Sequence, residues 1–167
     1  MLHIYRIEPM PSEKKTNAMR ILENLSIPYE VREYEYDEEN SDAVTAAKKT
    51  GLPPEQVFKT IVMRNNNKEI FVFCVPADQE VNLKKVRMLT DSKEILPVKQ
   101  DELLGLTGYI RGGCSPLGMK KKYQTFIDET AELFDFISVS AGQRGRQILV
   151  KAESLAAAAN ARFAELF

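Results

Sequence analysis

The chain has 167 residues, of which 44% are hydrophobic and 28% are charged, a balance typical of one globular domain. No apolar run approaches the roughly 20 residues of a membrane-spanning helix, and the N-terminal segment lacks the apolar core of a secretory signal, so we expect a cytoplasmic protein with no membrane partner. With 23 Lys and Arg against 24 Asp and Glu, the net charge is -1, and the broad basic excess of a protein that binds nucleic acid unaided is absent. Any contact with nucleic acid should therefore be local or depend on a partner.

Histidine and cysteine are scarce, and this excludes several kinds of active site. The single histidine, His3, lies near the start of the chain, and Cys74 and Cys114 are too far apart for a CxxC pair. A catalytic triad needs a histidine held by the core, and a structural zinc site needs four Cys or His ligands. We therefore expect no metal and no cofactor. An enzyme of this sequence would use lysine, backbone groups, carboxylates, hydroxyls or the substrate itself.

The first third of the chain predicts two helices separated by a strand and an acidic loop. The apolar residues Ala18, Ile21, Leu22 and Leu25 have the spacing of one buried helix face. Six acidic residues and no basic one between positions 33 and 42 favour a solvated loop. In chain order, the predicted elements are a helix capped by Thr16 or Asn17, a strand Tyr29–Tyr36 with a bulge near Arg32–Glu33, and a helix from Ser41 or Asp42 through Thr50 that ends at Gly51.

The rest of the chain predicts a β-hairpin followed by short helices and strands. Segments 57–64 and 70–75 are rich in β-branched and aromatic residues, and residues 65–68 between them favour a turn. Both strands are apolar on both faces, so they should lie centrally in a sheet. The remaining predicted elements are helices near Leu83–Leu89 and Asp101–Leu104, strands Thr125–Ile127, Phe136–Ser140 and Arg146–Lys151, and a C-terminal helix Ser154–Leu166. This order predicts an α+β fold, a single domain with a curved mixed sheet flanked by helices.

Lys59 is the first candidate for a functional residue. A period of two along the strand places its side chain on the same face as Val57, Ile61 and Met63. An ammonium group is unfavourable on an apolar face unless it is paired or meets a ligand. The alternative is that the side chain extends from a half-exposed strand to water.

A glycine cluster, with five glycines in 14 residues, is the second candidate. Residues 111–118 read as the end of a strand followed by a tight loop, in which adjacent glycines let a ligand approach the backbone N–H groups. Such a loop can stabilise an oxyanion or bind a phosphate or carboxylate, or it can be a structural turn. Cys114 lies in this loop, where nearby N–H groups would lower the pKa of its thiol. Cys74, in an apolar strand, is expected to be a packed thiol.

Basic residues accompany the glycines. Residues 111–122 contain four basic and no acidic side chains, and Arg144 and Arg146 flank a second glycine turn. These side chains form either a small cationic rim for phosphates or an ordinary solvated face.

Several motifs of the chain stand together in a specific order and spacing. They are Thr16–Leu22, Ile27–Tyr29, the Phe-Lys-Thr strand at Val57–Thr60, the Gly-Gly-Cys-Ser-Pro-Leu-Gly loop at Gly112–Gly118 with Lys120 and Lys121, and Val139–Gly145. In combination they resemble the YbaK-type Cys-tRNA(Pro) deacylases, relatives of the editing domain inserted in bacterial prolyl-tRNA synthetases. The resemblance extends from about Thr16 to Phe163, and it implies an N-terminal extension, residues 1–15, followed by an editing domain, residues 16–167.

The resemblance implies a barrel-like sheet and an enzyme that hydrolyses cysteine wrongly attached to tRNA(Pro), in trans, alongside prolyl-tRNA synthetase. It also implies that Lys59 is the catalytic residue. The residues that would hold the substrate are Tyr34, Thr60, Gly112, Gly113, Ser115, Pro116 and Ser140. Such enzymes let the substrate's own thiol attack the ester, which agrees with the scarcity of histidine.

The chain departs from the family pattern at two positions, and other functions stay open. Cys114 occupies a position that is usually aliphatic, and Gln124 one where proline is common. Related deacylases that remove alanine from the same tRNA share much of the pattern. A non-catalytic relative that binds tRNA ends or a nucleotide, or an interaction domain acting through its C-terminal helix, would be alternatives. The oligomeric state is unknown from the sequence.

Overall fold

The computed structural model describes residues 15–167, so His3 and nearly all of the predicted N-terminal extension lie outside the described residues. The helices are α1 (Asn17–Asn24), α2 (Ala43–Thr50), α3 (Leu83–Leu89), α4 (Gln100–Thr107) and α5 (Ala152–Ala159), with short 3-10 helices at Glu38–Asn40, Pro54–Gln56 and Glu129–Leu133. The strands are β1 (Glu30–Glu33), β2 (Phe58–Asn65), β3 (Ile70–Pro76), β4 (Ile95–Pro97), β5 (Gln124–Asp128), β6 (Ile137–Ser140), β7 (Arg146–Val150) and β8 (Ala161–Ala164). No helix within residues 15–167 has the length and apolar character needed to cross a membrane.

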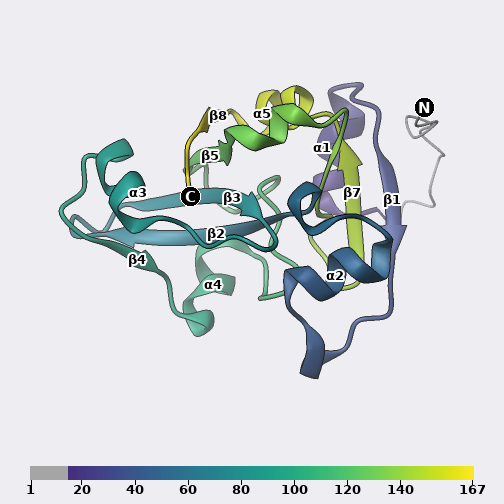
Figure 1. Ribbon diagram of the computed structural model, residues 1–167, viewed down its shortest axis with the longest axis horizontal. Helices are drawn as coiled ribbons and strands as arrows, with labels where there is room; N and C mark the ends of the chain where they lie inside the picture. Colours follow the sequence, from purple (N-terminus) through teal and green to yellow (C-terminus); the bar gives the residue numbers. More distant parts are fainter. Residues whose placement is uncertain (1–14) are drawn as a thin grey trace.

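The strands form two open sheets. One has the order β1-β7-β6 and is antiparallel; the other has the order β4-β2-β3-β5-β8 and is mixed, with β3, β5 and β8 parallel to one another. A single parallel bridge between Val57 and Ser138 joins them. Figure 1 shows the β2–β3 hairpin lying across the molecule, with β1 and β7 running crosswise to it. The predicted α+β fold with a mixed sheet is confirmed, but the sheet is not closed into a barrel, because the chain divides its strands between two sheets.

Several predicted elements are confirmed. Their sequence signals, capping residues and turn residues, lie within a few positions of the element that they predict. The β2–β3 hairpin has the expected antiparallel pairing, and β3 lies at the centre of its sheet. The side chain of Asn82 caps α3, and that of Asp42 caps α2, which ends at Gly51 in the left-handed conformation. Helix α4 is longer than expected and extends to Thr107.

The N-terminal helix buries most of the predicted face, with Leu25 as the exception. Helix α1 ends at Asn24, so Leu25 is already its C-cap residue and is 54% exposed. Ala18 and Leu22 are buried as predicted, Ile21 packs against the core, and Met19 is the buried residue that the pattern did not include. The following strand is also shorter than predicted. Its pairing with β7 runs without interruption from Glu30 to Glu33, so the expected bulge is wrong, and the change of phase marks the end of the strand.

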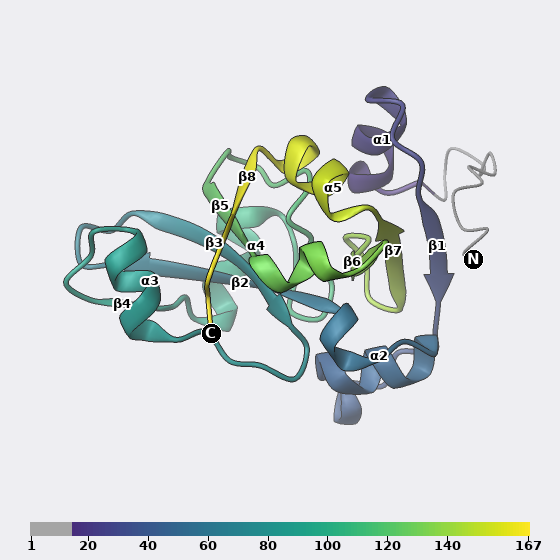
Figure 2. The same cartoon turned by 45° about the horizontal axis from the view of Figure 1, so that its top comes forward.

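The C-terminal segment is not one helix. Helix α5 ends at Ala159, its C-cap Asn160 has a φ of 50° in the left-handed region, and β8 then pairs in parallel with β5. Leu155 and Leu166 are fully buried. Figure 2 shows α5 leading into β8, which lies beside β5. This segment therefore belongs to the core, which argues against a detachable C-terminal interaction helix.

Candidate functional site

A cavity of about 390 Å³ lies where the two sheets meet, beside the first residues of β2. Strand β4 pairs with β2 only at Met63–Asn65. The outer edge of the first half of β2, which borders the cavity, is therefore not covered by another strand of the five-stranded sheet. The N-terminal end of α2, the segment after β1, the facing residues of β6 and β7 and the glycine loop complete the walls. The polar or reactive residues that line it include Tyr34, Lys59, Thr60, Glu80, Arg111, Gly112, Cys114, Ser140 and Gln147.

Lys59 presents the ammonium group of this cavity. Its Nζ donates hydrogen bonds to the Ala77 carbonyl at 3.3 Å and to Glu80 Oε1 at 3.1 Å. The Lys59 side chain is 21% exposed, whereas that of Glu80 is 92% exposed. An ion pair with so exposed a partner is weak, so an anionic ligand can replace Glu80 while the Ala77 carbonyl still holds the lysine.

A polar chain crosses the opposite wall. Ser138 Oγ donates to Gln147 Oε1 at 3.0 Å, which leaves the amide nitrogen of Gln147 to donate to the Tyr34 hydroxyl. Burial raises the pKa of Tyr34, and the hydrogen bond from Gln147 acts in the opposite direction. Ser140 pairs with Gln147 across β6 and β7 and faces the same cavity. The neutral Tyr34 hydroxyl can therefore orient a polar group of a ligand.

The glycine loop forms the third wall, and its two adjacent glycines have different surroundings. Gly112 has a φ of +86°, and a Cβ there would lie 2.9 Å from the Tyr36 hydroxyl. Gly113 packs against another loop, since a Cβ would lie 3.1 Å from the Arg144 backbone nitrogen, and its own N–H donates to the Ile110 carbonyl at 3.0 Å. The N–H groups of Gly112 and Cys114 have no hydrogen-bond partner within residues 15–167. Both residues line the cavity, so these two amides, and not that of Gly113, are the candidates for contact with a ligand.

The remaining predicted residues divide between the cavity and the structure behind it. Thr60 lines the cavity, next to Lys59 on β2. Ser115 is fully buried and its Oγ accepts the Leu117 N–H at 3.2 Å, and Pro116 is buried as well. Gly113, Ser115 and Pro116 therefore support the loop and do not line the cavity. The predicted strand before the loop is absent, since residues 109–123 contain no strand.

Both cysteines carry unreactive thiols. Burial raises the pKa of Cys114 to about 12, although a hydrogen bond with Thr107 opposes this, and burial raises the pKa of Cys74 to about 12. The expected lowering of the Cys114 pKa is therefore wrong, because loss of water around the sulfur outweighs the nearby N–H groups. Neither thiol can serve as a nucleophile near neutral pH.

The basic residues do not form one rim. Arg111 lines the cavity, whereas Arg144 stacks on the Tyr36 ring at 4.9 Å and pairs with Glu38, and Arg146 pairs with Glu33. Lys121 lines a separate hollow. Arg111 and the three lysines at 120–122 are exposed, whereas Arg144 and Arg146 are partly buried and paired, so neither the single rim nor the solvated face describes all six cations.

The sequence did not indicate Gln147 and Glu80 as site residues. Gln147 is a single polar residue that interrupts an apolar strand, and it lies opposite Ser140 in the predicted hairpin. That pairing of two polar residues was the one sequence feature that could have indicated Gln147 as a site residue. Glu80 lies on an exposed segment with no local signal. Among the described residues, no three His, Cys, Asp or Glu side chains gather as a possible metal site.

Comparison with known proteins places the chain in one class. The family described as "Aminoacyl-tRNA editing domain" matches residues 37–158, which include the β2 edge and the glycine loop. The chain belongs to the aminoacyl-tRNA editing domain family.

Individual proteins similar to this chain include a deacylase and a ligase that act on tRNA, by the names they carry. The chain is 38% identical over 155 residues to the Enterococcus faecalis protein named "Putative Cys-tRNA(Pro)/Cys-tRNA(Cys) deacylase EbsC", covering 93% of this chain and 94% of that one. It is 32% identical over 88 residues to a proline–tRNA ligase of Trichlorobacter lovleyi, covering 52% of this chain and 15% of the ligase. The crystal structure of "a putative trans-editing enzyme for prolyl tRNA synthetase" has the same fold, with a TM-score of 0.76 at 21% identity, covering 91% of this chain and 97% of that one.

Proposed function

We propose that this protein is an aminoacyl-tRNA deacylase that hydrolyses the ester joining cysteine to tRNA(Pro). Family membership and the name of the Enterococcus faecalis relative support the reaction class and the amino acid. The observation that carries the proposal is the cavity itself, which offers one ammonium group, several hydroxyls and two unpartnered N–H groups but no activated nucleophile.

Lys59 would place the terminal ribose or phosphate of the substrate by its positive charge. Its partner Glu80 is exposed and easily replaced. The N–H groups of Gly112 and Cys114 would polarise the ester carbonyl. Tyr34, Thr60 and Ser140 would position the aminoacyl group, with Gln147 holding the Tyr34 hydroxyl in place.

The nucleophile is best supplied by the substrate. The thiols of Cys74 and Cys114 remain protonated because their pKa values are about 12, and the single histidine of the chain is His3. The thiol of the bound cysteine attacks its own ester carbonyl, so that a C–S bond forms and the C–O bond to the ribose breaks. The leaving ribose oxygen takes the proton that the thiol loses, and water then opens the resulting thiolactone to free cysteine.

The choice of tRNA would come from a partner. The name of the relative includes both Cys-tRNA(Pro) and Cys-tRNA(Cys), and the net charge of -1 gives little unaided attraction to RNA. Prolyl-tRNA synthetase, to which part of the chain is similar, is the partner we infer, acting with this protein in the cytoplasm.

The test is the rate of ester loss from tRNA(Pro) charged with cysteine, serine or alanine, with one enzyme preparation. We expect cysteine to be removed fastest, serine much more slowly and alanine near background, because a thiol is a far better nucleophile than a hydroxyl and alanine has neither. Cys-tRNA(Cys) in the same assay measures how much selectivity the protein has without a synthetase. Removal of alanine as fast as cysteine would contradict the thiol mechanism and indicate an alanine-removing deacylase instead.

A further inference from the structure

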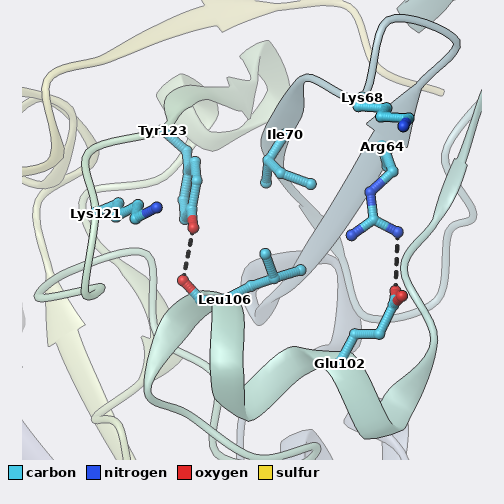
Figure 3. A pocket seen from close by; sticks show the side chains of 7 residues that line it. All are labelled: Arg64, Lys68, Ile70, Glu102, Leu106, Lys121 and Tyr123. Atoms are coloured by element: carbon cyan, nitrogen blue, oxygen red, sulfur yellow. Dashed lines mark hydrogen bonds and ion pairs between the residues drawn. The ribbon is translucent and has the colours of Figure 1, made fainter.

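A second hollow, separate from the cavity, lies between the far end of the β2–β3 hairpin, helix α4 and the segment before β5 (Figure 3). Its volume is about 570 Å³, and we call it the α4 groove. Its lining residues are Arg64, Lys68, Ile70, Glu102, Leu106, Lys121 and Tyr123. None of them lines the cavity described above.

The α4 groove carries an excess of positive charge. Arg64 is fixed at one wall, because its Nη1 donates to Glu102 Oε2 at 3.0 Å, and the same carboxylate oxygen accepts the Lys99 N–H at the start of α4. Lys68 and Lys121 are exposed, and neither forms an ion pair with a described residue. Three cations against one carboxylate favour a polyanionic ligand.

Lys68 is held in a conformation that lysine rarely adopts. Its φ is +63°, in the left-handed region that favours glycine and asparagine. The turn is fixed around it, since Asn65 Oδ1 accepts the N–H groups of Asn67 and Glu69. The hairpin turn therefore fixes the backbone of Lys68, whose side chain is one of the groove cations.

The floor of the groove is apolar and aromatic. The Tyr123 hydroxyl donates to the Leu106 carbonyl at 2.7 Å, which fixes the ring upright beside Lys121, with Ile70 and Leu106 next to it (Figure 3). A fixed aromatic ring flanked by cations suits nucleic acid, whose bases and riboses present flat apolar faces between phosphates.

Two elements connect the groove with the cavity. Strand β2 carries Thr60 at the cavity and Arg64 at the groove, on the same face of the strand and roughly 13 Å apart along it. Helix α4 lines the groove, and its first residue, Gln100, accepts a hydrogen bond from Arg111 of the cavity at 3.2 Å. We propose that the α4 groove binds the phosphate backbone of the tRNA whose aminoacyl end occupies the cavity. The identity of the RNA rests on the proposed function.

The experiment measures binding of the full chain to uncharged tRNA(Pro) by fluorescence anisotropy at several salt concentrations. The groove variants are Lys68→Asn and Lys121→Gln. The matched control is Lys84→Gln, an exposed lysine on α3, which packs on the opposite face of the sheet through Val86. Thermal unfolding of each variant is measured in parallel.

We expect each groove variant to bind about fivefold more weakly and to lower the slope of log affinity against log salt by about 1, as for loss of one phosphate contact. The control should bind like the unmodified protein. Lys68→Asn should unfold at an equal or higher temperature, because asparagine tolerates the left-handed conformation better. Glu102→Gln, which removes the groove carboxylate and keeps an acceptor for Arg64, should tighten binding.

Unchanged affinity and salt slope in both groove variants would overturn the proposal. If these variants instead lost affinity for prolyl-tRNA synthetase, the groove would bind an acidic protein surface and not RNA. Because binding of uncharged tRNA involves no ester, a protein that binds through the groove but leaves Cys-tRNA(Pro) intact would disprove the proposed function and keep this inference.

Discussion

At the scale of single residues, Lys59 differs from every other cation around the cavity in how it is held. Arg111 bonds to the side chain of Gln100, whereas Lys59 has one backbone carbonyl and one easily displaced carboxylate. When the substrate binds, the Lys59 ammonium can keep its hydrogen bond to the Ala77 carbonyl and exchange the Glu80 carboxylate for an anionic group of the substrate. This exchange requires no movement of β2.

We expect Lys59→Ala to slow deacylation of Cys-tRNA(Pro) at least about 100-fold, equivalent to about 2.7 kcal/mol of activation free energy. The fold should persist, because the lysine ammonium lies at the edge of the core and makes two hydrogen bonds in total. Single-turnover rates and circular dichroism measure the two effects.

Glu80→Gln is the matched control for this lysine. It removes the charge of the exposed partner, and the loss of rate should be far smaller, since exposed ion pairs contribute little. A well-folded Lys59→Ala protein with a nearly normal rate would show that the catalytic assignment is wrong.

The buried thiols give a prediction for alkaline pH. The pKa values of Cys74 and Cys114 are about 12 in the folded protein and near 9.0 when the thiols are free. Between these values the folded chain holds protons that the unfolded chain has lost, so stability is complete below about pH 9 and falls as the pH rises toward 12. The limiting loss is about 1.4 kcal/mol per pH unit for each thiol.

Urea unfolding between pH 8 and pH 10.5 measures this dependence, and Cys114→Ala isolates one thiol. The variant should be less stable at neutral pH but should lose less stability as the pH rises. Parallel curves for the two proteins would mean that the Cys114 thiol ionises as easily in the folded state as in the unfolded state.

At the scale of elements, the C-terminal strand depends on one buried carboxylate. Asp128, 1% exposed, ends β5; its Oδ1 accepts the Leu166 N–H at 2.8 Å, and its Oδ2 accepts the N–H and hydroxyl of Thr130. Asp128 therefore connects the residues after β8 to the 3-10 helix Glu129–Leu133, which directly follows β5.

Asp128→Ala should lower the free energy of unfolding by about 3 kcal/mol, because one buried and two partly buried donors lose their acceptor. Urea unfolding measures the loss, and amide exchange should show that β8 is affected most. Asp128→Asn, which keeps an acceptor, should lose less. If Asp128→Ala were no less stable than Glu129→Ala, a change at its exposed neighbour, the carboxylate would not be what holds β8.

The elements that the sequence predicted well are those whose signals lie within a few residues. Asn82 precedes its helix, and the turn residues 65–68 separate two apolar strands. Strand β8 was not predictable in this way, because an alanine-rich run favours helix and its pairing with β5 joins residues that are far apart in the chain. The same holds for the site: Lys59 stands out on its own strand, whereas the contact of Gln147 with Tyr34 exists only once β1, β6 and β7 are assembled.

At the scale of the whole molecule, the net charge conceals a division of charge around the cavity. The acidic segment 33–42 leads into α2, whose first residues line one rim. The basic α4 groove lies on the other side, beyond Arg111 and Gln100. If the proposed groove is correct, a polyanion approaching the cavity would meet the acidic segment at the α2 rim and the cations along α4. Composition averages these two regions, which is why the charge count could not indicate a binding direction.

The raised pKa of Cys114 also affects whether the enzyme can be inactivated by forming a disulfide with the cysteine that it releases. Each turnover would bring a cysteine thiol, or the free cysteine produced from it, beside a protein sulfur in the same cavity. Mixed disulfides form through a thiolate and are favoured by accessible sulfur. Cys114 as a residue is only 9% exposed, and its thiol stays protonated at physiological pH because burial raises its pKa, so it offers neither a thiolate nor a readily accessible sulfur. Burial thus protects the catalyst from being trapped by its own product under oxidising stress.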